Sequence, residues 1–192
     1  MLRLSPIEPN QVSKELQGML DRGQVGFEEI PTFLKILAKS PAAALAYVRA
    51  EDSLAGGQLS EREREQIALV VAEINGSKYC QLAHSVIGKN VGLTEKEVWS
   101  ARKATAPDPK TDQMLRFTQS VVVQRGEISD EGLCAIRKAG FSDAEVIEIV
   151  ANIALNILTN YINILSKTEM DFIAAGDGQA NALFGISKRA PA

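Results

Sequence analysis

Cys80 and His84 are the residues of this sequence whose types and spacing could carry chemistry. They lie four positions apart, so on a helix they share one face. Asn75-Gly76 is a helix end and Ser77 is a suitable N-cap, which places Cys80 in the first turn of the next helix. There the positive end of the helix dipole is expected to lower the pKa of a thiol. Such a pair can activate a nucleophile, although a Cys and a His at this spacing also occur in helices by chance.

The same two residues do not predict a metal centre. One cysteine and one histidine supply only two ligands, and no second pair lies nearby in the sequence. No glycine-rich phosphate or dinucleotide motif is present either. We therefore expect no metal and no cofactor.

The elements that position this pair are predicted to be helices. No segment alternates apolar and polar residues over six positions, whereas apolar residues recur at helical spacing within 67–74 and 146–164. Capping boxes mark helix starts at Ser60, Thr94 and Ser142, and glycines mark helix ends. The chain is predicted to be all-α, with helices near 11–22, 31–38, 41–55, 60–75, 78–91, 94–104, 110–125, 129–139 and 142–167.

The last of these helices is apolar on most of its circumference, so we expect it to be the central buried helix. Its polar residues form one line: Glu148, Asn152, Asn156, Asn160 and Asn163. Buried amides need hydrogen-bond partners, so the line predicts a hydrogen-bonded seam between helices or subunits. A face that lines a ligand site is the other interpretation. The polar line also argues against a membrane-spanning segment.

Composition narrows the class of protein. The formal net charge is −3, and the basic residues do not cluster, which argues against nucleic-acid binding through phosphate neutralisation. The N-terminus shows no signal-peptide pattern, so a cytoplasmic protein without membrane association is expected. Two cysteines make no disulfide framework. Cys134 is interpreted as a small buried hydrophobic residue.

The segment from Glu65 to His84 resembles the signature of the carboxymuconolactone decarboxylase/alkylhydroperoxidase-D (AhpD-like) family, as do the flanking Ala72-Glu73-Ile74-Asn75-Gly76 and Val91-Gly92-Leu93. That signature is a Glu, about a dozen residues, Cys-x-x-Cys, and a His four residues after the second Cys. The resemblance covers roughly residues 30–170. It implies an AhpD-like helical core at 31–167, between an N-terminal helical arm at 1–30 and a C-terminal tail at 168–192. A faint similarity between the segments that follow Ser60 and Ser142 suggests a duplicated helical unit.

The resemblance also implies an activity, the thiol-dependent reduction of alkyl hydroperoxides. Cys80 matches the cysteine that attacks peroxide, while His84 and Glu65 match the proton relay. Ser77 stands where the family has the resolving cysteine, so turnover would require an external thiol reductant. Ser77 and Tyr79 are expected to line the site. A homo-oligomer (dimer, trimer or hexamer) is implied as well.

Two alternatives stay open. The chain could be a decarboxylase-type enzyme for small acids, in which His84 or Glu65 transfers protons and Cys80 is incidental. Such a site would need cations in its pocket; Arg62, Arg64 and Lys78 are near in sequence but are expected on the solvated helix face. The second alternative is a non-catalytic oligomeric member of the family.

Overall fold

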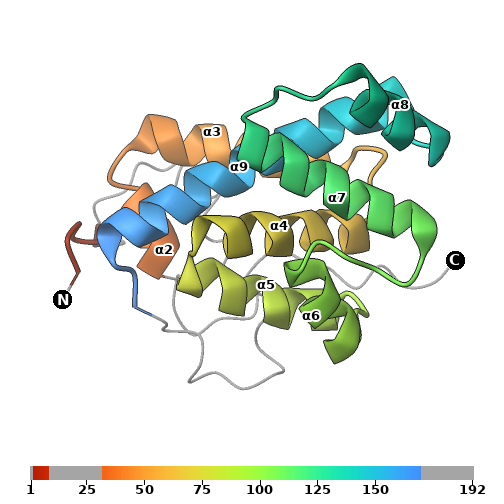
Figure 1. Cartoon of the computed structure of the whole chain (residues 1–192). Coiled ribbons are helices and arrows are strands. Elements are labelled where there is room, and N and C mark those ends of the chain that lie inside the picture. The colour runs from red at the N-terminus through yellow and green to blue at the C-terminus, as the bar shows by residue number, and fades with distance from the viewer. Residues whose placement is uncertain (1, 9–31, 170–192) are drawn as a thin grey trace, which may run out of the picture.

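The computed structural model describes residues 2–8 and 32–169, and this part of the chain is built of α-helices without strands. Figure 1 shows α4 at the centre, with α9 crossing above it and α5 and α6 below. The helices are α2 (Thr32–Leu37), α3 (Pro41–Ala55), α4 (Glu61–Asn75), α5 (Lys78–Asn90), α6 (Glu95–Arg102), α7 (Pro109–Gln124), α8 (Asp130–Lys138) and α9 (Asp143–Ser166). The all-α prediction is confirmed, with helix ends within about two residues of those expected.

The helix starts form for the reason that the sequence predicts. Ser60, Thr94 and Ser142 each accept a hydrogen bond from the amide of the glutamate three residues on, and that glutamate reaches back to the capping residue. Each box satisfies two amides that would otherwise lack partners at the helix start. The boxes therefore fix where α4, α6 and α9 begin. The expected helix at 11–22, most of the N-terminal arm and most of the C-terminal tail lie outside the described residues.

The core has two parts. One cluster of buried apolar side chains lies between α4, α6, α7, α8 and α9. The other lies between α2, α3, α5 and α9, and it contains Cys80. α4 is buried without interruption from Gln66 to Ala72, so it joins the two clusters. The candidate site is thus embedded in the core and not carried on a loop.

Two expectations are wrong. α9 is not buried all round: it packs along α4 with one face, while Ile147, Leu158 and Tyr161 are exposed on the other. α4 is the central helix instead. Cys134 is exposed, because α8 buries only Ile136 and directs the cysteine to solvent.

Among the described helices, α9 alone is long and apolar enough to cross a bilayer by length and composition. The core helix of a soluble protein also passes this test.

Candidate active site

The turn between α4 and α5 places Cys80. Gly76 ends α4 in a left-handed conformation, with φ of 69°, which a residue with a side chain adopts only under strain. Ser77 follows as the N-cap position, and α5 begins at Lys78, so Cys80 lies in the first turn as predicted. Ser77 makes no capping hydrogen bond through its side chain. Its hydroxyl is buried near the Cys80 thiol instead.

The thiol of Cys80 is buried and contacted from α9. Asn163 donates a hydrogen bond from Nδ2 to Sγ over 3.3 Å. Burial raises the pKa of Cys80, because a thiolate loses solvation inside the protein; polar contacts with Ser77, Asn163, Thr159 and Asn160 lower the pKa but do not cancel that effect. The expected depressed pKa is therefore wrong for this site. Cys80 is a thiol that needs a base next to it.

His84 and Glu65 form an ion pair across α4 and α5. His84 Nδ1 lies 2.8 Å from Glu65 Oε2, and both side chains are more than four-fifths buried. Burial alone would lower the pKa of His84, but the charge and hydrogen bond of Glu65, together with the charge of Glu51, raise it overall. The carboxylate thus makes the imidazole a stronger base. It also orients the ring by holding Nδ1.

Cys80 and His84 line the same cavity, which the sequence could only suggest. The cavity measures about 20 Å³, which is room for about one water molecule. Aromatic and aliphatic side chains make its walls, and Phe33 packs against Tyr47 and Tyr79 at ring-centroid distances of 5.6 and 6.4 Å. Its lining residues are Phe33, Tyr47, Glu51, Tyr79, Cys80, Ala83, His84, Leu155, Asn156, Thr159 and Asn163. Tyr79 is thus among the residues that line this cavity, whereas Ser77 is not and contacts the Cys80 thiol.

Sequence reasoning missed Glu51 and Tyr47. Both come from α3, and Glu51 remains solvent-accessible where it lines the cavity. Glu51 is an exposed residue, but its carboxyl loses solvation to the surrounding protein. This desolvation and the charge of Glu65 raise the pKa of Glu51. The charges of His84 and Arg64 and a hydrogen bond with Tyr47 lower that pKa without cancelling the rise. Tyr47 is buried, and its own pKa is raised by burial first and by the nearby Glu51 second. A Tyr and a Glu four residues apart in an alanine-rich helix carry no signal that would have identified them.

The polar residues along α9 form a hydrogen-bonded seam at some positions and line the cavity at others. Glu148 accepts hydrogen bonds from the amides of Gln58 and Leu59, and Asn160 accepts one from Asn75, so part of the line is a seam between helices. Asn156 and Asn163 line the cavity. Within the described residues, Asn160 Nδ2 and Asn163 Oδ1 are buried without a hydrogen-bond partner. These atoms leave donor and acceptor capacity beside the thiol.

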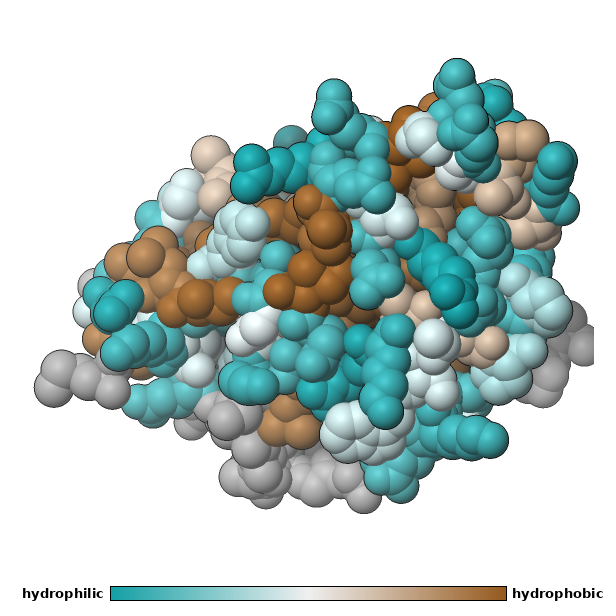
Figure 2. Space-filling view, in the orientation of Figure 1, coloured by the Kyte–Doolittle hydropathy of each residue, from teal (hydrophilic) through white to brown (hydrophobic). Residues whose placement is uncertain are grey.

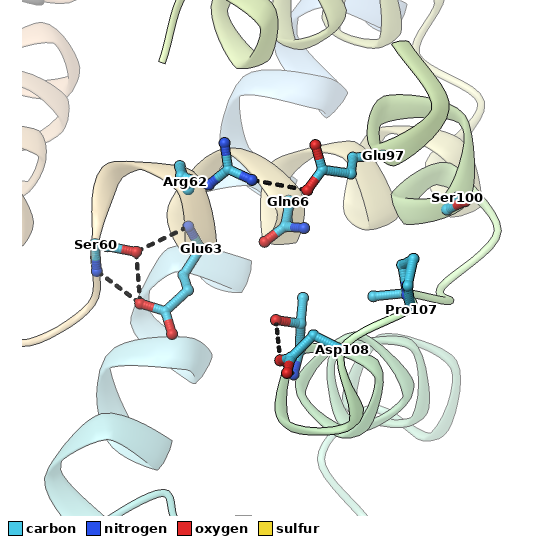
Figure 3. A pocket seen from close by; sticks show the side chains of 10 residues that line it. Ser60, Arg62, Glu63, Gln66, Glu97, Ser100, Pro107 and Asp108 are labelled. Carbon is cyan, nitrogen blue, oxygen red and sulfur yellow. Dashed lines mark hydrogen bonds and ion pairs between the residues drawn. The ribbon is translucent and has the colours of Figure 1, made fainter. Parts of the chain in front are cut away.

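A larger pocket, of about 360 Å³, lies on another part of the surface, between the start of α4, α6 and the loop before α7. Figure 3 shows the charges of this pocket turned toward one another or toward helix starts: Arg62 pairs with Glu97 at 2.8 Å, Glu63 binds Ser60, and Asp108 caps its own helix. The pocket contains no cysteine and no histidine. It offers hydroxyl groups but neither a thiol nor an imidazole to activate them, so the small cavity at Cys80 is the candidate active site. In residues 2–8 and 32–169, no three potential ligands gather to hold a metal ion.

One family model and several solved structures resemble this chain. Residues 41–121, the segment from α3 through most of α7, match the model of the Carboxymuconolactone decarboxylase family. That segment resembles the family in sequence, and the fold of the chain is AhpD-like. The resemblance read from the Glu65–His84 motif is thereby confirmed. No curated protein matches the chain in sequence.

Solved structures extend the similarity of fold over nearly the whole chain. An uncharacterized peroxidase-related protein from Silicibacter sp. TM1040 is similar with a TM-score of 0.78 at 22% identity, covering 93% of this chain and 96% of its own. An AhpD-core peroxidase-related protein from Ralstonia eutropha JMP134 gives 0.78 at 22%, covering 100% and 98%. A variant of the debrominase Bmp8, in complex with 2,3,4-tribromopyrrole, gives 0.75 at 16%, covering 92% and 96%. At these identities the similarity shows the fold, which hosts more than one chemistry.

Proposed function

We propose that this protein is a single-cysteine peroxidase that reduces organic hydroperoxides with electrons from an external thiol. The observation that supports it most is that the Cys80 thiol and His84 line one small cavity, and that Glu65 pairs with His84. Nucleophile, base and orienting carboxylate are the three parts of an activated-nucleophile site. The two peroxidase-related neighbours share this fold.

The first chemical step follows from the protonation states. His84 accepts the proton of the Cys80 thiol, whose raised pKa keeps it protonated until then. The thiolate attacks the distal peroxide oxygen; the S–O bond forms as the O–O bond breaks. The imidazolium returns its proton to the leaving alkoxide, which departs as an alcohol. Cys80 is left as a sulfenic acid.

The second step needs a thiol from outside. Ser77 has a hydroxyl where the family has a resolving cysteine, and Cys134 lies on α8, which contributes nothing to the cavity lining. An external thiol attacks the sulfenic sulfur, releasing water and leaving a mixed disulfide on Cys80. A second thiol reduces that disulfide. The sum is one hydroperoxide and two thiols converted to alcohol, water and one disulfide.

The decarboxylase-type alternative is less favoured by the cavity. Small acid substrates need a cationic partner, and no lysine or arginine is among the described lining residues. Of the three cations considered from the sequence, Arg62 pairs with Glu97 at the larger pocket, Arg64 donates to the Leu59 carbonyl, and Lys78 contacts Gln81.

The aromatic walls of the cavity leave reductive debromination as a second candidate function, because the Bmp8 structure holds a bromopyrrole on the same fold. Bromide release from bromopyrroles would test it.

The experiment for the main proposal joins turnover and trapping. Purified protein is supplied with cumene hydroperoxide and dithiothreitol, and peroxide loss is followed while dimedone traps sulfenic acid for peptide mass spectrometry. We expect turnover, and dimedone on the Cys80 peptide. Cys80→Ser should abolish both and Cys134→Ser neither. Turnover that survives Cys80→Ser would refute the proposal.

A further inference from the structure

Two carboxylates lie at or next to the cavity. Glu51 lines the cavity from α3 and is exposed to solvent, and Glu65 pairs with His84 from α4. Against these two carboxylates the lining contributes only the imidazole of His84. Arg64 acts on Glu51 from outside the lining, with a guanidinium NH bound to the Leu59 carbonyl. With a neutral His84, these two carboxylates and Arg64 leave one net negative charge; with a protonated His84 the charges balance, and the described lining itself holds no lysine or arginine.

The rest of the lining is uncharged. Three aromatic rings and Leu155 present apolar surface, while Asn156, Thr159 and Asn163 present neutral polar groups. The cavity has room for about one water molecule, so it can take the peroxide oxygens of a hydroperoxide next to the amides. The aromatic or alkyl group that carries them would remain outside, on the side of the exposed Glu51. A carboxylate on the same group would have to pass Glu51 without a cation to receive it.

We propose that Glu51 is a specificity-determining residue that excludes negatively charged molecules, so that the substrates are uncharged aryl or alkyl hydroperoxides. This rests on the proposed function in that the substrate reacts at Cys80. The selection itself is electrostatic and does not depend on peroxide chemistry. It therefore applies to any reagent that must pass Glu51 to reach the thiol.

The test uses this independence. Iodoacetamide and iodoacetate differ in charge but alkylate thiols by the same displacement. Both cysteines of the chain are labelled at pH 8 and low ionic strength, and each is quantified by peptide mass spectrometry. Cys134 is exposed on α8 and does not line the cavity, so it serves as the internal comparison. The measured quantity is the iodoacetamide-to-iodoacetate rate ratio at each cysteine.

Glu51→Gln removes the charge at nearly constant volume. We expect it to lower the rate ratio at Cys80 about three- to tenfold, and to leave the ratio at Cys134 unchanged, because a nearby exposed charge acts over about one Debye length. Glu51→Lys should lower it further, and salt should diminish the discrimination of the wild type. The matched control is Asp52→Asn, which makes the same charge change at an exposed neighbouring position of α3. It should change the Cys80 ratio less than twofold.

The same variants are then given cumene hydroperoxide and its para-carboxylate. Wild type should prefer the neutral compound, and Glu51→Gln should reduce that preference by a factor similar to the one found with the alkylating reagents. Equal ratios in wild type and Glu51→Gln would overturn the inference, as would a Cys80 that iodoacetamide cannot label while Cys134 is labelled. Charge-selective alkylation without peroxide turnover would overturn the proposed function and leave the role of Glu51 standing.

Discussion

Asn163 of α9 donates a hydrogen bond to Cys80 of α5, with Nδ2 3.3 Å from Sγ. These residues are 83 positions apart in the chain, and their contact joins the last described helix to the first turn of the helix that carries the nucleophile. A donor aimed at sulfur favours the thiolate, while burial opposes it. The pKa of the thiol thus depends on residues of α9 as well as on the motif around Cys80.

Asn163→Ala should therefore raise the pKa of Cys80 further and slow its reaction with iodoacetamide at pH 7 about tenfold, because a hydrogen bond to a charged group contributes about 1.5–3 kcal/mol. The pH dependence of alkylation measures both effects. Asn152→Ala is the matched control, since the Asn152 amide binds a carbonyl of its own helix. Equal pH profiles for wild type and Asn163→Ala would contradict the assignment.

Glu65→Gln should lower peroxide turnover about a hundredfold at pH 7, within the range of general acid–base catalysis. The amide keeps the shape of the side chain but loses the charge that makes His84 a stronger base. Stopped-flow rates of Cys80 oxidation measure the effect. Glu61→Gln is a control on the same helix at an exposed position. If Glu65→Gln kept the wild-type rate, Glu65 would have no part in the relay.

The Glu65–His84 pair should also give stability a defined pH dependence. The folded-state pKa of His84 is raised above its ordinary value, so the folded state binds the proton more tightly than the unfolded state. The contribution is present in full below the unfolded pKa of about 6.5 and is lost as pH rises through the folded pKa. Urea unfolding of Cys80→Ser should show a midpoint that falls from pH 6 upward. With His84→Gln added, the midpoint should fall less over the same range; parallel slopes would exclude the linkage.

Ser77→Cys should convert the site to a two-cysteine form. Ser77 is buried near the thiol, so a cysteine there would be placed to attack the sulfenic acid of Cys80. After one equivalent of peroxide, we expect a disulfide between positions 77 and 80, seen as a loss of two hydrogens in the mass of the peptide. Dimedone trapping should fall in parallel. The variant is made in a Cys134→Ser background, and persistent sulfenic acid would show that the two sulfurs cannot meet.

The exposed face of α9 predicts self-association. From Ile149 to Ser166 the helix carries no charged residue, and Figure 2 shows hydrophobic side chains gathered along its course. The exposed apolar residues of the face are Ile147, Val150, Leu158, Tyr161, Ile164 and Leu165. An uncharged face of this length is best covered by an equally uncharged one, which a second copy of the chain provides. We propose a homo-oligomer through α9.

Leu158→Glu would place a charge in the middle of this face, where Leu158 is already exposed, and should reduce the mass measured by light scattering to that of one chain. Val123→Glu, at an exposed position on α7, is the control for an added surface charge. A wild-type protein of monomeric mass would contradict the proposal.

The sequence by itself determined the helices and the central motif. Capping boxes, the Gly76 stop and the apolar period act over a few residues, so Ser60, Thr94 and Ser142 could be recognised as helix starts without the fold. The same local logic placed Cys80 in a first turn and put His84 on its face. Glu65 joined them through the family motif, and the tertiary structure brings it to 2.8 Å from His84.

Only the tertiary structure decided the surroundings of the thiol. Burial depends on which helices meet, and it raises a pKa that the helix dipole alone was expected to lower. Glu51 and Asn163 reach the cavity from α3 and α9, by contacts between segments far apart in the chain that no local pattern encodes. Exposure of Cys134 and of the outer face of α9 was decided in the same way, because a helical period shows that a face is apolar but not what covers it.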